Sequence, residues 1–191
     1  MRISPHSDQD RKRNRLKGYD YSNDGFYSVT ICTRDREHLF GKICNDKMVL
    51  NKLGKIAEKC WREIPDHFTD VKLDEFVVMP NHIHGIVWID YWNDGENTKS
   101  VGNADLRSLT KAKPDDRTKM LLSKIIHGFK SSVTRIIRHQ NLNTNFVWQK
   151  SFHDRIIRNE NELNNIREYI WLNPERWKKD RNNVMTKEYF R

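Results

Sequence analysis

Two histidines stand two positions apart in the stretch VVMPNHIHGIVWI, at His82 and His84. Because side chains alternate along a β-strand, both imidazoles project from the same face of a sheet. Paired imidazoles on one rigid face can chelate a divalent metal ion. The alternative is that one or both histidines only form hydrogen bonds at the start of the strand, and the spacing alone does not decide between these roles.

A tyrosine and an asparagine form a second candidate pair in IREYIWLNPERW. Tyr169 and Asn173 lie four positions apart on a predicted helix, so they share one face near its end. A tyrosine hydroxyl has a pKa of about 10, so its attack on a phosphate needs a cation that neutralises the developing charge. The Asn173 amide oxygen can bind such a cation. By themselves, Tyr169 also fits a core or surface aromatic, and Asn173 a residue that ends a helix.

The chain is polar and basic, with 32% charged residues and a net charge of +9. Clustered lysine and arginine side chains attract polyanions and release their counterions, so a polyanionic partner is expected. Charge alone does not choose between DNA, RNA and an anionic membrane. The length of 191 residues fits one main domain with a proper core.

The sequence predicts a cytoplasmic protein with no membrane partner. No apolar run approaches the roughly 20 residues needed to span a bilayer, and the first residues lack the apolar core of a signal peptide. Cys32, Cys44 and Cys60 are odd in number and widely spaced, which indicates reduced structural thiols rather than disulfides or a zinc site.

Alternating and helical patterns predict the elements that must position these residues. Strands are predicted at 26–33, 71–79 and 82–89, with shorter pieces at 146–148 and 152–157. Helices are predicted at 51–64, at 120–138 and from Asn159 to near Pro174. This order suits an α+β fold, a ferredoxin-like antiparallel sheet covered by helices, in which the C-terminal helix carries Tyr169.

Three parts are predicted along the chain: a basic polar N-terminal arm at 1–24, a main domain at 25–178 and a C-terminal tail at 179–191. Residues 90–117 of the main domain are polar and rich in Asn, Asp, Gly, Lys and Ser, which predicts an insertion loop. The basic run in the N-terminal arm can bind phosphate or simply be solvated, and we favour the solvated tail.

Three stretches together closely resemble the REP-associated tyrosine transposases, which belong to the single-tyrosine branch of the HUH nuclease superfamily: MPNHIHGIV, KIIHGFKSSVTR and VWQKSFHDRIIRNENELNNIREYIWLNPERW. The resemblance spans residues 24–178 and keeps the order of the three motifs. It implies that His82 and His84 bind the metal, that Tyr169 is the nucleophile and that Asn173 is the third metal ligand. It also implies the ferredoxin-like fold and Mg²⁺ or Mn²⁺ as cofactor.

The activity implied by the resemblance is a transposase-type nuclease that cleaves and rejoins single-stranded, hairpin-bearing DNA through a 5′-phosphotyrosine intermediate. A monomer is favoured over a homodimer. Two alternatives stay open. One is a domesticated, non-catalytic protein that recognises repeat hairpins, against which the intact set of four site residues counts. The other is a nuclease that activates water, in which Tyr169 is structural.

The DNA contacts are expected on the basic outer face of the helix at 120–138, from Lys124, Lys130, Arg135 and Arg138. Tryptophans could stack on unpaired bases, although a place in the core fits each of them better: Trp148, Trp171 and Trp177. His153 and Asp154 fit the lining of the site and a structural role in a strand equally well.

Overall fold

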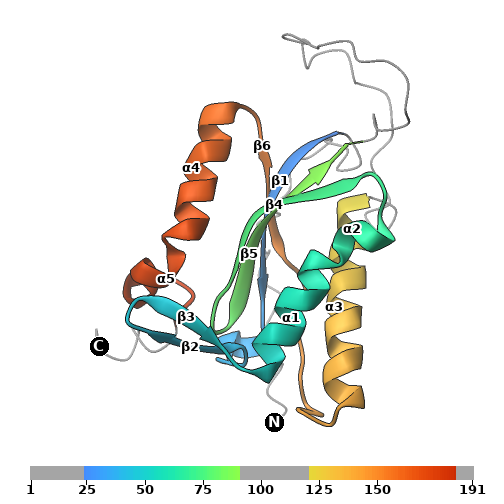
Figure 1. The fold of residues 1–191 in the computed structure, drawn as a ribbon, viewed down its shortest axis with the longest axis vertical. Coiled ribbons are helices and arrows are strands. Elements are labelled where there is room, and N and C mark those ends of the chain that lie inside the picture. The colour runs from blue at the N-terminus through green and yellow to red at the C-terminus, as the bar shows by residue number, and fades with distance from the viewer. Residues whose placement is uncertain (1–23, 91–120, 184–191) are drawn as a thin grey trace, which may run out of the picture.

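The structure, a computed structural model, describes residues 24–90 and 121–183 (Figure 1). Four strands form one antiparallel sheet in the order β4-β5-β1-β6. Their bounds are Gly25–Cys32 for β1, Val71–Val78 for β4, His82–Ile89 for β5 and His153–Ile157 for β6. The predicted α+β class with an antiparallel sheet is confirmed.

Helices cover both faces of this sheet. On one face lie α1 (Lys52–Arg62), the short α2 (Ile64–His67) and α3 (Leu121–His139), and on the other lies α4 (Glu160–Trp171) (Figure 1). Asn51 and Asn159 begin α1 and α4, because each side chain accepts a hydrogen bond from a backbone N–H of the first turn. No helix in the described ranges is long and apolar enough to cross a membrane.

Two short elements at the C-terminal end of α4 return the chain toward the sheet. They are α5 (Asn173–Arg176) and the 3₁₀ turn η2 (Trp177–Lys179). Pro174 stands at the start of α5, where its missing N–H costs no hydrogen bond. The predicted end of the long helix near Pro174 is therefore confirmed.

A hairpin between β1 and α1 was not expected from the sequence. It consists of β2 (Gly41–Cys44) and β3 (Lys47–Leu50), and follows the 3₁₀ turn η1 (Arg34–Arg36). Its two turn residues, Asn45 and Asp46, have φ angles of 49° and 58°, as a tight two-residue hairpin requires. The predicted strand at 146–148 is wrong, since Trp148 forms only an isolated bridge to Thr33.

The predicted parts of the chain are only partly described. The arm at 1–24 and the loop at 90–117 lie outside the described residues except for Asp24 and Asp90. Of the tail at 179–191, residues 179–183 are described. The boundaries of the three parts stay predictions.

Strand β5 is buried on both faces and lies between two separate clusters of apolar side chains. Ile83, Val87 and Ile89 pack with the helices α1 and α3, whereas Ile86 packs with α4. Gly85 lies against Trp61 of α1, and a Cβ at this position would come within 2.3 Å of the indole ring. The glycine after the two histidines therefore lets α1 approach the sheet closely.

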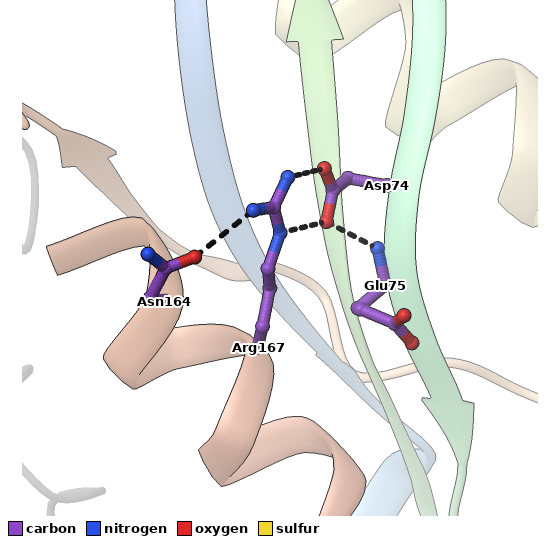
Figure 2. Close-up of polar contacts among 4 residues, drawn as sticks. All are labelled: Asp74, Glu75, Asn164 and Arg167. Carbon is purple, nitrogen blue, oxygen red and sulfur yellow. Dashed lines mark hydrogen bonds and ion pairs between the residues drawn. The ribbon is translucent and has the colours of Figure 1, made fainter. Parts of the chain in front are cut away.

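Helix α4 is fixed to β4 by the ion pair between Asp74 and Arg167 (Figure 2). Arg167 donates to both carboxylate oxygens, from Nε at 2.8 Å and from Nη2 at 2.5 Å. Its Nη1 donates to Asn164 at 3.0 Å. Asp74 reaches α4 from a bulge in β4, where the register with β5 shifts between Leu73 and Phe76.

We expect Asp74→Asn to lower the free energy of unfolding by about 0.5–1 kcal/mol at pH 7, a modest value because Arg167 is 38% exposed and solvent screens the pair. Hydrogen bonds from Arg167 hold the pKa of Asp74 below its ordinary value of 3.8. This stabilisation is therefore present at neutral pH and is lost as the pH falls through the lowered pKa.

Urea unfolding of the parent and the variant at pH 7 and near pH 3 measures both effects. Glu75→Gln is the matched control, because it removes a charge next to Asp74 while its side chain points away from Arg167 (Figure 2). Equal losses for the two variants at pH 7 would contradict the assigned role of the ion pair.

Candidate active site

The two histidines predicted as metal ligands lie side by side on the face of β5 that α4 covers. Their ring centroids are 4.5 Å apart, and the side chains of His82 and His84 are buried. Alternation along β5 places both rings on this face together with Ile86, which packs against α4. The predicted juxtaposition of the two imidazoles is thus observed.

Hydrogen bonds orient both rings through their Nδ1 atoms. His84 Nδ1 lies 2.8 Å from Thr30 Oγ1, and His82 Nδ1 lies 2.8 Å from Asn81 Oδ1. His82 Nε2 is buried and has no hydrogen-bond partner. Ring orientation by the second nitrogen is what metal-binding histidines generally require.

Burial keeps both imidazoles neutral. It lowers the pKa of His82 well below its usual range and lowers the pKa of His84 to about 3, with the charge of Arg181 acting in the same direction on both. A neutral imidazole has a lone pair for a cation, so the two rings are in the protonation state that metal binding needs.

Tyr169 of α4 reaches the histidines. Its hydroxyl lies 3.4 Å from His84 Nε2, and the two rings meet edge to face with centroids 5.2 Å apart. Tyr169 is 41% exposed, so the residue lies at the surface of the protein although its hydroxyl contacts a buried histidine. Burial of its inner part raises the pKa of Tyr169, and Asp180 adds to this, whereas a hydrogen bond with Asn173 opposes it.

Asn173 also lies at this site. Its side chain is 1% exposed, and its Oδ1 has no hydrogen-bond partner. The hydrogen bond that lowers the pKa of Tyr169 shows that the amide is next to the phenol. Asn173 as a metal ligand stays a prediction, with a buried and unpaired oxygen in its favour.

Asp180 is a candidate ligand that the sequence analysis missed. One atom each from His82, His84 and Asp180 lie within 4.8 Å of one another. Asp180 follows η2, which brings the chain back over the histidines, and Trp177 packs on His82 with ring centroids 5.9 Å apart. No local motif marks Asp180, because its place depends on the turn of the chain after α4.

Arg36 and Arg181 add positive charge to the rim of the site, and both were missed. Burial is the main cause of the lowered pKa values of His82 and His153, and the two guanidinium groups add to it. Arg36 Nη1 also donates to the Arg181 carbonyl at 2.7 Å. His153 pairs with Thr30 across β1 and β6, as His84 does across β1 and β5, so the three residues share one sheet face.

The four basic residues predicted to bind DNA fall into two groups. Lys124 and Arg135 are exposed on α3. Lys130 instead donates to the Gln149 and Ser151 carbonyls at 2.9 and 3.2 Å, and burial lowers its pKa to about 8. Arg138 donates to the Phe146 carbonyl at 3.3 Å, so both of these side chains are engaged in holding the loop after α3.

The three tryptophans considered for stacking on bases differ in their exposure. Trp148 and Trp177 are buried, whereas Trp171 is 71% exposed on α4. Asp154 is buried in β6. Of the three tryptophans, Trp171 alone is available for stacking on a base.

No family model matches the chain. An uncharacterized protein of Haemophilus influenzae is 41% identical over 170 residues, which cover 89% of this chain and 91% of that protein. Among solved structures, a REP-associated tyrosine transposase bound to a REP hairpin superposes with a TM-score of 0.50 and 18% identity, over 88% of this chain and 74% of that one.

The identity to the Haemophilus protein establishes common family membership, and the structural match establishes the fold. The chain therefore belongs to one family with the uncharacterized Haemophilus influenzae protein and has the fold of the REP-associated tyrosine transposase, in agreement with the resemblance of its three motifs.

Proposed function

We propose that the protein is a metal-dependent, single-tyrosine transposase-type nuclease that cleaves and rejoins single-stranded, hairpin-bearing DNA. The observation that carries the proposal is the Tyr169 hydroxyl, 3.4 Å from His84 Nε2 and beside the cluster of His82, His84 and Asp180. The fold is shared with a transposase whose structure contains a REP hairpin, which supports DNA of this kind as the substrate.

The donor set fits a divalent cation. His82 and His84 provide neutral imidazoles, and oxygen donors are available from Asp180 and Asn173. Two nitrogen donors with a carboxylate and an amide oxygen suit Mn²⁺, and also Mg²⁺. When bound, the cation would neutralise the charge that develops on the scissile phosphate.

Tyr169 supplies the attacking oxygen. Its Oη forms a bond to phosphorus, the bond from phosphorus to the 3′ oxygen breaks, and that oxygen takes up a proton to become a 3′-OH. The phenol proton passes to solvent as the new bond forms; burial, which raises the pKa of Tyr169, opposes its loss, and the hydrogen bond with Asn173 favours it. Attack of a 3′-OH on the phosphotyrosine reverses these steps, reseals the strand and regenerates the phenol.

The basic rim suits the phosphate that is cut. Arg36 and Arg181 lie near the histidines, where their guanidinium groups would hold a phosphate against Tyr169. The histidines and the tyrosine of one chain complete the site, which supports the monomer as the functional unit.

We expect Tyr169→Phe to abolish cleavage while metal and DNA binding stay near those of the parent, because the change removes the attacking oxygen and keeps the ring. With end-labelled hairpin DNA and Mn²⁺, the parent should form a protein–DNA adduct that survives denaturation and disappears with protease. Peptide mapping should place the nucleotide on Tyr169, and Glu168→Gln, next to it on an exposed position of α4, should react like the parent.

Continued cutting by Tyr169→Phe would exclude the tyrosine mechanism in favour of a nuclease that activates water. Binding of the hairpin with neither adduct nor cleavage in the parent would favour the non-catalytic hairpin-binding protein.

We expect His82→Ala combined with His84→Ala to lose measurable Mn²⁺ binding in calorimetric titrations, and Asp180→Asn to weaken it by at least about tenfold. Asn173→Ala tests the remaining predicted ligand in the same titration. His139→Ala removes an exposed imidazole at the end of α3 and should bind Mn²⁺ like the parent. Circular dichroism of each variant checks that it is folded. Parent-like affinity in the double histidine variant would show that the metal binds elsewhere.

We expect the parent to bind hairpin-bearing single strands more tightly than plain duplex, with an affinity that falls as salt rises. Lys124→Ala combined with Arg135→Ala should reduce the slope of log affinity against log salt by about two if both residues contact phosphates. Lys59→Ala is the control, because Lys59 is already paired with Glu63. Fluorescence anisotropy at several salt concentrations measures the affinity of the parent, the double variant and the control. An unchanged slope in the double variant would show that these two residues of α3 do not contact the DNA.

A further inference from the structure

The side chain of Asn81, just before β5, is fully buried between two segments that are distant in the sequence. Its Nδ2 donates to the Arg36 carbonyl at 2.9 Å and to the Asn182 carbonyl at 2.8 Å. A carbonyl cannot donate, so the NH₂ group must face these two atoms, and the orientation of the amide is determined by chemistry.

The amide orientation determines which nitrogen of His82 carries the proton. Asn81 Oδ1 is left facing His82 Nδ1 at 2.8 Å, and an amide oxygen can only accept a hydrogen bond. His82 Nδ1 must therefore carry the hydrogen. Because a neutral imidazole has a single N–H, Nε2 holds the lone pair.

That lone pair points to a ligand. His82 Nε2 is buried and has no hydrogen-bond partner, which is costly for a polar atom unless a cation or a donor fills the place. The atom belongs to a ring that lies with His84 and Asp180 in the cluster of candidate ligands. Because Nδ1 is engaged by Asn81, this tautomer leaves Nε2 as the nitrogen of His82 with a lone pair for a ligand.

The same amide also holds the segment that carries Asp180. The Asn182 carbonyl accepts from Asn81, and the Asn182 N–H donates to Asp180 Oδ1 at 2.6 Å. The Arg181 carbonyl between them accepts from Arg36, whose own carbonyl accepts from Asn81. The Asn81 side chain therefore links His82, the turn η1 that contains Arg36, and the residues around Asp180.

We propose that Asn81 is a positioning residue of the metal site, which fixes the tautomer of His82 and holds Asp180 next to it. The proposal rests on the metal site of the proposed function and assigns Asn81 no contact with metal or DNA. Its loss acts through His82 and Asp180, so it changes metal affinity before any DNA is bound.

The test compares Asn81→Ala with Asn182→Ala. Asn182→Ala removes a buried amide of the same kind but keeps both hydrogen bonds of the Asn182 backbone, so it is a matched control. Long-range ¹H–¹⁵N correlation spectra of ¹⁵N-histidine-labelled, metal-free protein report the tautomer of His82, whose signals are assigned by their loss in His82→Gln. Calorimetric titration with Mn²⁺ reports the affinity.

We expect the parent and Asn182→Ala to hold the hydrogen of His82 on Nδ1 and to bind Mn²⁺ within about twofold of each other. Asn81→Ala should shift His82 toward a mixture of tautomers and weaken Mn²⁺ binding by about 10–100-fold, as losses of such orienting partners generally do. A folded Asn81→Ala with parental tautomer and affinity would overturn the proposal.

If Asn81→Ala does not fold, the tautomer of His82 in the parent protein still tests the proposal. A hydrogen on Nε2 of His82 would contradict it directly. These measurements use no DNA and no cleavage, so they are independent of the nucleophile. Parent protein that holds the hydrogen on Nδ1 but binds no Mn²⁺ would refute both the metal part of the proposed function and the role of Asn81 in it.

Discussion

Helix α4 lies on the sheet face that carries the two histidines, and the candidate site depends on this contact. Ile170 and Leu163 of α4 pack against Ile86 and Ile157 of the sheet, and the ion pair of Arg167 with Asp74 fixes the helix on the side of the edge strand. Tyr169 stands on the other flank of the same helix. A small rotation of α4 would separate its hydroxyl from His84, so packing and charge together set the position of the nucleophile.

Most of the fold followed from local patterns, because hydrophobic periodicity reports which face of an element is buried. The alternation around His82 and His84 predicted their common face. The spacing of Tyr169 and Asn173 predicted that they are neighbours, but Asn173 lies in α5, beyond the end of α4, and not on one helix with Tyr169. The hairpin of β2 and β3 was missed because its strands have four residues each and only Asn45 and Asp46 mark the turn. The elements that were predicted correctly are long, amphipathic segments.

The rest of the site could not be predicted from local patterns. Asp180 and Arg181 reach the histidines only because η2 turns the chain back, and Arg36 reaches them from the turn after β1. Lys130, in contrast, was predicted to bind DNA although its side chain is engaged within the protein. Its helical spacing placed it correctly on the side of α3 that is not in the core, but the carbonyls of the next loop bind its ammonium group, a long-range contact that periodicity does not report.

The bulge in β4 has a consequence for how the gene of this protein can vary. Leu73 and Val78 face the helices α1 and α3 although an odd number of positions separates them, because one extra residue is accommodated between Leu73 and Phe76. Removal of Glu75 would restore strict alternation, in which Leu73 and Val78 keep the face toward α1 and α3 and Asp74 keeps the face toward α4. The register of β4 is therefore compatible both with substitutions at exposed Glu75 and with a deletion of its codon.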